Sequence, residues 1–408
     1  MRRPRRRWPV STLTTHRIAL LFNANKIYDR EIISGIAAYL RSTRVSWDLF
    51  LEEDFRFRLQ GIEEWDGDGI IADFDDPAVQ QALSKRRVPV VAVGGSYADA
   101  SKYPADIPYV ATDNSALVRL ALDHLIEAGL TNFAMFSLPE ADENRWAQER
   151  ELAFSHHMKR DRMAAVVYRG HTTSAPTWNQ SIDALTKWLQ ALPKPVGIVA
   201  VTDARARQLL QACMIAGIAV PEEVSLIGID NDPLARMLTR IPLSSVLQGT
   251  DQMGRTAAQL LHQMLGGKRL GNTRILVPPV GVNALASTQH ESMKHPIVMR
   301  ARHFIRQYAC QGIKTTQVAD YVGTSRSSLE SHFRSALGRS VHDEILRFKI
   351  DAATTVLSNG PDKIADIAVN CGFTSVQYMH EVFKRELGCT PRQYRDRNST
   401  AQQVSIAS

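Results

Sequence analysis

The chain has 408 residues, more than one hydrophobic core usually serves, so we expect two or three domains. Its 49 Lys and Arg outnumber its 42 Asp and Glu, which gives a net charge of +7. No run in the sequence reaches the ~20 apolar residues that a bilayer-spanning helix needs, and residues 11–16 are too polar for a secretory signal. The sequence thus predicts a cytoplasmic protein with no membrane partner.

The positive charge is concentrated at the two ends of the chain. Residues 297–398 hold 15 Lys and Arg against 10 Asp and Glu, and residues 1–16 add five Arg, whereas residues 17–296 carry 29 against 32. A basic C-terminal segment suits a partner that carries phosphates. We interpret residues 1–16 as a disordered basic arm, because a solvated tail is commoner than a specific contact in so short a run of charge.

The four cysteines have neither paired nor metal-like spacing in the sequence. They are Cys213, Cys310, Cys371 and Cys389. We therefore expect reduced, buried thiols and no metal site.

From residue 17 to about residue 279, short apolar runs alternate with amphipathic segments. The runs are almost continuously apolar, as in a parallel sheet buried on both faces. They cover residues 18–22, 69–72, 88–93, 133–136, 164–168, 197–201 and 224–229, and helical patterns cover residues 29–40, 115–128 and 204–216. This alternation predicts an α/β fold with right-handed crossovers. The number of strands favours two lobes, each with its own parallel sheet.

Polar side chains follow five of these runs, where each strand should end. They are Asn23, Asn25, Asp73, Asp75, Ser96, Thr202, Asp203, Asp230, Asn231 and Asp232. Ligands of such sheets bind beyond the carboxyl ends of the strands. Carboxylates and amides around one cleft suit a neutral polyol, since each carboxylate accepts from two hydroxyls, and they would repel an anion. Any single member could equally cap a helix, but five similar ends favour a shared site.

Four aromatic residues lie close to these strand ends in the sequence. They are Phe22, Tyr28, Phe74 and Trp146. Each could stack on one face of a sugar ring, and each could instead belong to the hydrophobic core.

An enzyme is a competing interpretation of the acidic strand ends. Asp73 and Asp75 resemble a glycosidase pair in composition. Two carboxylates at one strand end, however, lack the separated acid and nucleophile that hydrolysis needs. The sequence also contains no phosphate-cradling glycine loop and no nucleophile elbow. We therefore expect a binding protein that is not an enzyme.

One phrase occurs twice near the C-terminus. Residues 333–340 and 383–390 share Phe-x-x-x-Leu-Gly-x-Ser/Thr, and the same plan precedes each copy. Gly323 and Gly372 can take the left-handed conformation that ends a helix, and a serine two or three residues later can cap the next one. A single copy could be an ordinary helical hairpin. Two copies in a basic segment instead predict two helix-turn-helix units that read DNA.

The second helix of each predicted unit has a buried and an exposed face. Leu329, Phe333, Met379 and Phe383 should point inward at helical spacing. The outward face is predicted to enter the major groove. The residues that we expect on this DNA-binding face are Arg326, Ser327, Glu330, Ser331, Val376, Gln377, His380 and Glu381, with Arg334, Lys384 and Arg385 on phosphates.

Residues 297–398 resemble the DNA-binding domain of AraC-family transcription factors. The resemblance is strongest over residues 364–375 and 388–395. It implies seven helices, with a long linking helix at about residues 342–358 between the two helix-turn-helix units, and two recognition helices in successive major grooves. Lys349 stands where the family usually has Arg.

Residues 17 to about 285 resemble the ligand-binding domain of LacI/GalR-type repressors and their periplasmic relatives. The residues that carry this resemblance are 111–114, 149–154, 201–205, 227–230 and 243–248. It implies that four residues hold the sugar: Arg150, Asp203, Asp230 and Gln248. It also implies that Asp113 and Asn114 start a helix of the second lobe, and we interpret these two as structural.

The order of the two regions is itself a signature. LacI-type repressors carry their DNA reader at the N-terminus, whereas this chain has an AraC-type reader at the C-terminus. Together with residues 24–30, 52–56, 67–76, 93–97 and 275–280, this order makes the chain similar to xylose-responsive activators. The resemblance implies a homodimer that uses D-xylose as effector, needs no cofactor, binds promoter half-sites and contacts RNA polymerase to activate genes of xylose uptake and catabolism. Another pentose or a hexose stays possible as the effector, as does a sugar-binding protein without a role in transcription.

The complete prediction has four segments and ten sugar-binding residues. The segments are a basic arm (1–16), a two-lobed sugar-binding domain (17–289), a DNA-binding domain (290–398) and a tail (399–408). The predicted sugar-binding residues are Asn25, Tyr28, Asp73, Asp75, Ser96, Trp146, Arg150, Asp203, Asp230 and Gln248.

Overall fold

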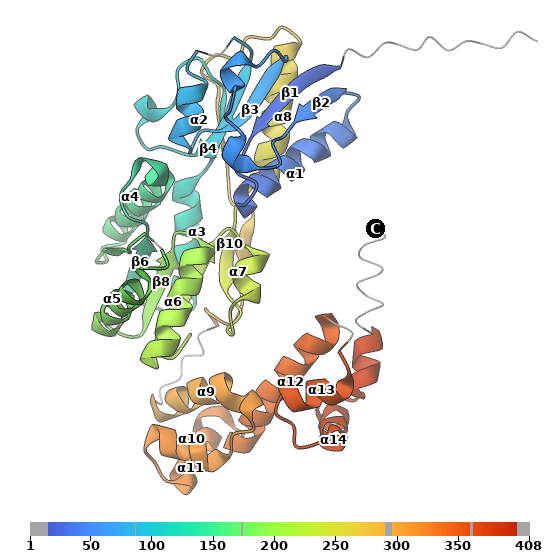
Figure 1. The fold of residues 1–408 in the computed structure, drawn as a ribbon. Helices are drawn as coiled ribbons and strands as arrows, with labels where there is room; N and C mark the ends of the chain where they lie inside the picture. The colour runs from blue at the N-terminus through green and yellow to red at the C-terminus, as the bar shows by residue number, and fades with distance from the viewer. Residues whose placement is uncertain (1–14, 86, 173, 290–295, 360–361, 398–408) are drawn as a thin grey trace, which may run out of the picture. The chain divides into compact units, whose positions relative to one another are not determined.

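The computed structural model describes residues 15–85, 87–172, 174–289, 296–359 and 362–397. The chain divides into two compact units, Met1–His290 and Glu291–Ser408, which are described separately (Figure 1). Almost all of the predicted arm and the whole predicted tail lie outside the described residues.

The first lobe of the N-terminal unit contains a parallel sheet in the order β11-β5-β4-β3-β1-β2. Its strands are β1 (His16–Leu21), β2 (Trp47–Phe50), β3 (Gly69–Asp73), β4 (Val90–Gly95), β5 (Tyr109–Thr112) and β11 (Arg274–Val277). Its helices are α1 (Ile27–Ser42), α2 (Pro77–Ala82) and α8 (Thr250–Leu265), with short 3-10 turns η1 (Phe55–Phe57), η2 (Ile62–Glu64) and η3 (Ala100–Lys102).

The second lobe contains a sheet in the order β12-β10-β9-β8-β6-β7, parallel except for β12. Its strands are β6 (Phe133–Ser137), β7 (Val166–Arg169), β8 (Val196–Ala200), β9 (Val224–Ile229), β10 (Ser244–Leu247) and β12 (Gly281–Asn283). Its helices are α3 (Asn114–Glu127), α4 (Arg145–Arg160), α5 (Trp178–Ala191), α6 (Asp203–Ala216) and α7 (Pro233–Met237), with η4 (Asp142–Asn144) before α4.

The strands alternate their side chains between two apolar layers, as a parallel sheet covered on both faces requires. In β1, Ile18 and Leu20 enter one core of the first lobe, whereas Ala19 and Leu21 enter the other. The second sheet likewise separates two cores. The predicted parallel α/β architecture is therefore confirmed, with β12 as the antiparallel exception.

The chain crosses between the lobes three times within the described residues. It passes from β5 to α3, returns from β10 to α8, and passes again from β11 to β12. Each lobe is thus assembled from segments far apart in the sequence, and the carboxyl ends of both parallel sheets border one cleft.

Helices α1 and α8 approach closely enough to exclude side chains at two glycines. A Cβ on Gly35 would lie 2.0 Å from the Asp251 carbonyl oxygen, and one on Gly254 would lie 2.0 Å from the Ile32 carbonyl oxygen. Glycine is therefore required at both positions. Because α1 follows the cleft residues 23–26 directly, this contact holds that edge of the cleft in place.

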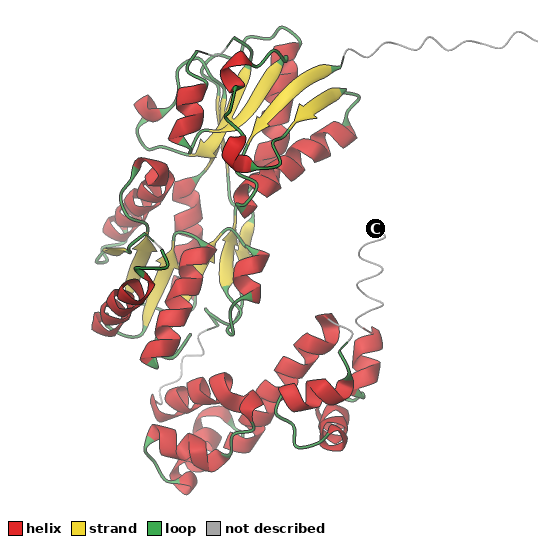
Figure 2. Ribbon diagram, viewed as in Figure 1, coloured by secondary structure: helices red, strands yellow, loops and turns green. Residues whose placement is uncertain are grey.

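The described part of the C-terminal unit is entirely helical (Figure 2). It contains α9 (Pro296–Tyr308), η5 (Ala309–Gln311), α10 (Thr315–Val322), α11 (Arg326–Leu337), α12 (Val341–Asn359), α13 (Ile364–Asn370) and α14 (Val376–Leu387), and residues 391–397 form a further helix. Helix α12 matches the predicted linking helix. The C-terminal unit has two hydrophobic cores, one in its first half, with α9 to α11, and one in its second half, with α13 and α14. Near the start of α12, Val341 and Ile345 pack in the first core, and further along the helix Ile350 and Leu357 pack in the second.

The two helix-turn-helix units form as their turn chemistry predicts. Gly323 and Gly372 have φ of +72° and +73°, and the hydroxyls of Ser325 and Ser375 accept from the backbone N–H groups three residues on, at 3.2 and 3.1 Å. Leu329, Phe333, Met379 and Phe383 are fully buried, as predicted. The prediction for Val376 was wrong: it is half-buried and packs on the second core, because it begins α14 beside that core.

Candidate functional site

A cavity of about 310 Å³ lies between the two lobes at the carboxyl ends of both sheets. Both lobes contribute to its lining: Asn25, Lys26, Ile27, Tyr28, Asp73, Asp75, Gly95, Thr112 and Asn114, then Trp146, Arg150, Thr202, Ala204, Asp230, Asp232 and Gln248. Eight of the ten predicted sugar-binding residues are among them. That each contacts a sugar stays a prediction.

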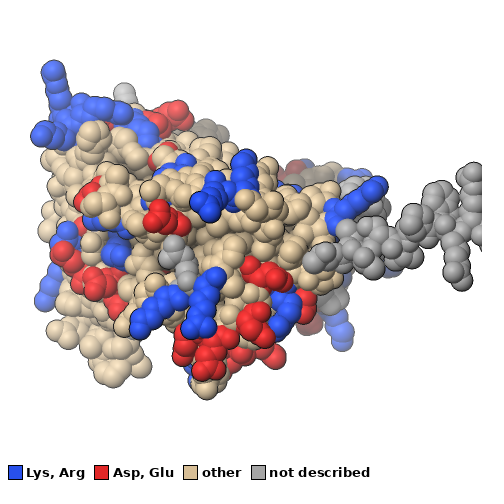
Figure 3. All heavy atoms as spheres, turned by 90° about the horizontal axis from the view of Figure 1, so that it is seen from above, with Lys and Arg blue, Asp and Glu red and all other residues tan. Residues whose placement is uncertain are grey.

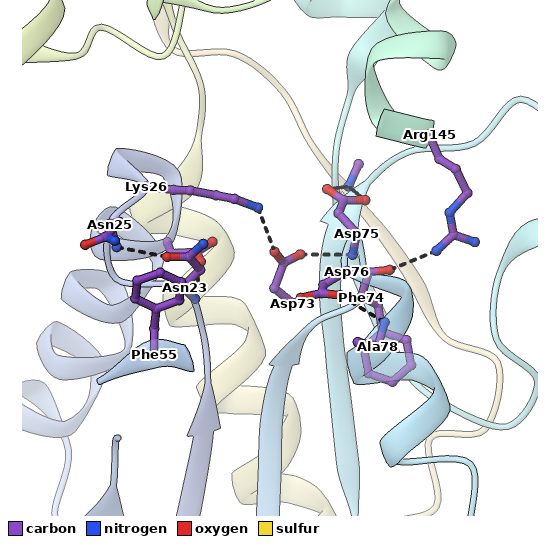
Figure 4. A network of polar contacts seen from close by, with 12 residues as sticks. Asn23, Asn25, Lys26, Phe55, Asp73, Phe74, Asp75, Asp76, Ala78 and Arg145 are labelled. Atoms are coloured by element: carbon purple, nitrogen blue, oxygen red, sulfur yellow. Dashed lines mark hydrogen bonds and ion pairs between the residues drawn. The ribbon is translucent and has the colours of Figure 1, made fainter. Parts of the chain in front are cut away.

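The first-lobe wall is built around two carboxylates at the end of β3. The Asp75 N–H donates to Asp73 Oδ1 at 3.0 Å, and the Gly95 N–H donates to both oxygens of Asp75 at 2.9 and 3.0 Å. Figure 4 shows the Lys26 side chain extended toward Asp73, with 3.8 Å between Nζ and Oδ2. Burial, and then the neighbouring Asp73 charge, raise the pKa of Asp75 to about 7.

The second-lobe wall is organised by a buried guanidinium on α4. Arg150 donates to Asn114 Oδ1 at 3.1 Å, to Gln248 Oε1 at 3.2 Å and to the Val201 carbonyl. Its guanidinium carbon lies 4.9 Å from the ring centroid of Trp146, so the two side chains fix each other's position. Arg150 thus presents a positive charge to the cavity on a rigid support.

Asp230 closes the same network at the end of β9. The Gln248 amide donates to its carboxylate at 2.6 Å, and Gln248 Oε1 also accepts from the Thr112 hydroxyl at 3.1 Å. Removal from water raises the pKa of Asp230 to about 7, although the Arg150 charge opposes the shift. The backbone of Asp230 is strained at φ +117°, as is common for residues held in a binding site.

Four hydrogen bonds tie the lobes together beside the cavity. Arg145 on α4 donates to the Phe74 carbonyl at 3.5 Å and to Gln80 Oε1 at 3.2 Å, and the Phe74 bond is drawn in Figure 4. Glu149 accepts from Lys102 Nζ and from the Ala98 N–H, both at 2.8 Å. The lobes are therefore closed on each other along this flank of the cleft.

Two predicted sugar-binding residues do not line the cavity. Asp203 is fully buried, and its oxygens accept from the Asp232 N–H at 2.7 Å and the Ser245 hydroxyl at 2.6 Å. The Ser96 hydroxyl accepts from the Asn114 N–H at 2.9 Å. Both side chains therefore hold neighbouring residues of the cavity wall in place and do not themselves line the cavity. Of the four aromatic residues that could have stacked on a sugar, Phe22 and Phe74 are only 1% and 2% exposed, so both belong to the hydrophobic core.

The sequence analysis missed several residues that line the cavity. They are the polar residues Lys26, Thr112 and Asn114. Thr202 and Asp232 also line the cavity; the sequence analysis named both as polar strand-end residues but left them out of the ten predicted sugar-binding residues. The prediction that Asp113 is structural is correct, since its carboxylate accepts from the Ala116 N–H at 2.9 Å at the start of α3. The same prediction for Asn114 was incomplete, because Asn114 also faces the cavity and orients Arg150. Asn114 could have been predicted to face the cavity, because it lies where the chain crosses from β5 of the first lobe to α3 of the second.

The predicted DNA-binding residues lie on α11 and α14 with different exposure. Arg326, Ser327, Ser331, Arg334, Gln377, Glu381, Lys384 and Arg385 are exposed, whereas Glu330 and His380 are half-buried. The Glu330 carboxylate accepts from the Val341 N–H at 3.2 Å, at the start of α12. Glu330 therefore has a helix-capping role, and its contact with a base stays a prediction. Figure 3 looks onto the first lobe of the N-terminal unit, and on that face acidic and basic side chains are interspersed.

Three family models together span most of the chain. The XylR N-terminal domain matches residues 17–115, the periplasmic binding protein-like domain matches residues 122–288, and the helix-turn-helix domain matches residues 318–397. The xylose operon regulatory protein of Escherichia coli (strain K12) is 48% identical over 94% of this chain and 98% of its own length. The chain belongs to the family of xylose operon regulatory proteins. The Haemophilus influenzae member is 44% identical over 93% of this chain and 98% of its own length.

A solved structure of this family has the same fold. The xylose-binding transcription activator XylR is 46% identical, with a TM-score of 0.83 over 94% of this chain and 99% of that chain. The predicted class is thus confirmed: the chain is a DNA-binding transcription regulator with a sugar-binding domain, and it is not an enzyme. None of the helices in the described ranges is long and apolar enough to cross a membrane.

Proposed function

We propose that this protein is a D-xylose-dependent transcription activator of the cytoplasm, in which sugar bound between the lobes controls the C-terminal DNA reader. The observation that supports it most strongly is the cavity at the meeting point of both sheets, whose lining includes four carboxylates, a lysine and an arginine. Relatives over nearly the whole chain are named for xylose, which makes D-xylose the first sugar to test.

The chemistry of the cavity suits an uncharged monosaccharide. Its volume of about 310 Å³ is at the small end for ligand sites. Asp73, Asp75 and Asp230 can each accept from adjacent hydroxyls, and Arg150 can donate to a ring or hydroxyl oxygen. Four lining carboxylates face two lining cations, Lys26 and Arg150. A sugar phosphate would therefore be disfavoured.

The switch follows from a ligand that contacts both lobes. A sugar held by Asp75 on the first lobe and Asp230 on the second favours the closed cleft over an open one. Glu149 and Arg145 already join the lobes in the closed state, so the sugar adds to existing contacts. A shift from 1:99 to 99:1 would need about 5.5 kcal/mol of differential affinity for the two states.

The output of the switch is promoter binding by a homodimer. Two helix-turn-helix units per chain can read successive major grooves, and two chains can then occupy repeated half-sites. We assign base contacts to Arg326, Ser327, Glu330, Ser331, Gln377, His380 and Glu381, and phosphate contacts to Arg334, Lys384 and Arg385. Contact between this complex and RNA polymerase would then activate the adjacent genes.

Isothermal titration of the full chain with D-xylose tests the sugar, and promoter binding with and without D-xylose tests the switch. We expect saturable heat with D-xylose and tighter promoter binding in its presence. L-arabinose, D-ribose and D-glucose in the same titration distinguish a xylose regulator from one that responds to another pentose or a hexose. Absence of heat with every sugar, or equal promoter affinity with and without the bound sugar, would overturn the proposal.

A further inference from the structure

Two cysteines from different halves of the C-terminal unit are in contact. Cys310 lies in η5, directly after α9, and Cys371 follows α13 in the second half. They are 61 positions apart in the sequence, yet their thiol groups hydrogen-bond to each other. Cys310 also packs against the second-half core that contains Cys371. Cys310 is half-buried and Cys371 is buried, so a small reagent reaches Cys310 first.

The backbone around the two sulfurs is held rigidly. A Cβ on Gly372, the residue after Cys371, would lie 2.5 Å from the Cys310 carbonyl oxygen. Lys349 on α12 donates from Nζ to the Gly372 carbonyl at 2.6 Å, and the Cys371 N–H donates to Ile367 at 2.9 Å. The contact between the thiols is therefore a consequence of backbone packing between the two halves.

The two thiols have opposite chemical character. The hydrogen bond from Cys371 lowers the pKa of Cys310 to about 7, against the effect of burial, and the Lys349 ammonium adds to the lowering. The same hydrogen bond, and then burial, raise the pKa of Cys371. A thiolate next to a neutral thiol is the arrangement of an attacking cysteine and its resolving partner.

We propose that Cys310 and Cys371 are a modification site at which a hydroperoxide produces a reversible disulfide between the two halves of the DNA-binding unit. In the first step the Cys310 thiolate attacks the peroxide oxygen, an S–O bond forms, the O–O bond breaks, and water or an alcohol leaves after protonation. In the second step the Cys371 sulfur attacks the sulfenic acid and water leaves. The two thiols lose two electrons and two protons to the peroxide, and a dithiol restores them.

The disulfide would join η5, which precedes the first helix-turn-helix unit, to the turn of the second unit. It would close a loop that contains the recognition helix α11 and the linking helix α12. Since Cys310 already packs against the core that contains Cys371, the bond would fix an arrangement that exists in the reduced protein. The inference is independent of which sugar binds in the cleft.

Peptide mapping of the oxidised full chain tests the proposal directly. The protein is treated with hydrogen peroxide, its remaining thiols are blocked with N-ethylmaleimide, and it is digested without reduction. We expect a cross-linked peptide pair that contains Cys310 and Cys371 and lacks two hydrogens, and dithiothreitol should separate the pair. Persistence of both residues as blocked thiols, or linkage of either one to Cys213, Cys389 or a second chain, would overturn the proposal.

Serine variants distinguish the attacking from the resolving cysteine. In Cys371→Ser, Cys310 should accumulate as a sulfenic acid that dimedone traps, whereas in Cys310→Ser, Cys371 should stay reduced. Loss of the hydrogen bond in Cys371→Ala should also slow alkylation of Cys310 at pH 7 by about threefold, because its smaller thiolate fraction outweighs its greater nucleophilicity. Cys213→Ser, in the sugar-binding unit, is the control and should leave the cross-link unchanged. Oxidation of Cys371 in Cys310→Ser at the rate seen in the unmodified protein would contradict the assignment.

Discussion

Gln248 donates from its side-chain amide to the Asp230 carboxylate at 2.6 Å. The two residues follow the adjacent parallel strands β10 and β9, whose register pairs Val246 with Ile229. The same glutamine accepts from Thr112 of the first sheet at 3.1 Å. One side chain therefore connects a predicted sugar ligand on the second lobe to the wall of the first.

Asp230→Asn should weaken D-xylose binding by roughly 10–100-fold. Loss of a charged acceptor costs about 1.5–3 kcal/mol, because hydrogen bonds to a charged group are stronger than neutral ones. Isothermal titration measures the change. Asp48→Asn, an exposed aspartate on β2, is the matched control and should bind as the unmodified protein does. Equal affinity of the two variants would remove Asp230 from the site.

D-xylose affinity should rise between about pH 6 and pH 8. The pKa values of Asp75 and Asp230 are both raised to about 7, and hydroxyl donors favour the ionised carboxylates, so binding near pH 7 should release protons. Titrations in buffers of different ionisation enthalpy measure this release. Strongest binding at pH 6, with proton uptake, would contradict the prediction.

The same raised pKa values make the unliganded N-terminal unit less stable as pH rises. Between about pH 4 and pH 7 the folded chain binds more protons at Asp75 and Asp230 than the unfolded chain, whose carboxyls have the ordinary value of 3.8. The free energy of unfolding therefore falls across this range and levels off above it. Denaturation midpoints should show a smaller fall for Asp75→Asn, because an amide does not titrate. If stability falls with pH as steeply in this variant as in the unmodified protein, Asp75 does not contribute to the pH dependence.

Gly372→Ala should destabilise the C-terminal unit more than Gly323→Ala does. Both residues have positive φ, which costs an alanine about 1–2 kcal/mol. An added Cβ meets the Cys310 carbonyl at 2.5 Å only at Gly372, whereas nothing in the described structure lies within 4 Å of it at Gly323. We expect an extra cost of about 1–3 kcal/mol for Gly372→Ala. Urea denaturation compares the two, and equal losses would mean that the two halves separate easily.

Glu344→Gln should cost about 3–5 kcal/mol of stability in the C-terminal unit. Glu344 is fully buried on α12 and accepts from Arg302 at 2.7 Å and from Arg339. Burial alone would raise the pKa of Glu344, but these arginines and Arg347 lower it below the ordinary glutamate pKa of 4.5. The ionised carboxylate therefore stabilises the folded unit fully above pH 4.5, and this stabilisation is lost as the pH falls through the pKa of Glu344 in the folded chain.

The exposed pair of Arg385 and Glu386 provides the control for that substitution. Glu386→Gln should cost no more than about 1 kcal/mol, since both side chains are about half exposed to water. Denaturation midpoints of the two variants measure the difference. Similar losses would show that the buried network contributes little beyond a surface pair.

Gln377→Ala and Lys384→Ala should change DNA binding in different ways. Loss of the Gln377 amide should cost about 1–3 kcal/mol and relax the preference at one base pair. Lys384→Ala should weaken operator and random DNA alike and reduce the salt slope by about 1. DNA-binding titrations at several salt concentrations distinguish the two effects. If Gln377→Ala lost the same affinity for operator and for random DNA, Gln377 would not contact a base.

Strands marked by an almost continuous apolar run could be predicted, and those without such a run could not. The run at residues 224–229 matches β9 residue for residue. Strand β2 was missed because Asp48, Leu49 and Phe50 are exposed at the edge of the first sheet, where no buried run is required. Strands β5, β10, β11 and β12 were also missed, because each is only three or four residues long and includes a polar residue, which leaves two or three consecutive apolar positions.

The sequence identified which strand ends are polar, but it did not identify which side chains reach the cavity. Asp203 and Asp230 look alike in the sequence, yet Asp203 turns to Ser245 and the Asp232 N–H, while Asp230 faces the cavity. Burial, and then the charge of Asp230, raise the pKa of Asp203 to about 8, which is consistent with its supporting position. Lys26 was overlooked because a lysine before a helix is ordinarily a solvated residue.

By itself the sequence determined the α/β class, the duplicated helix-turn-helix units and the family, because these depend on spacing between near neighbours and on a long matching signature. The tertiary structure decided which residues meet across the cleft and that Cys310 lies on Cys371. Those contacts depend on three chain crossings between lobes and on the packing of α12 against both halves. Residues far apart in the chain are brought together there by the summed burial of many others, which no local pattern records.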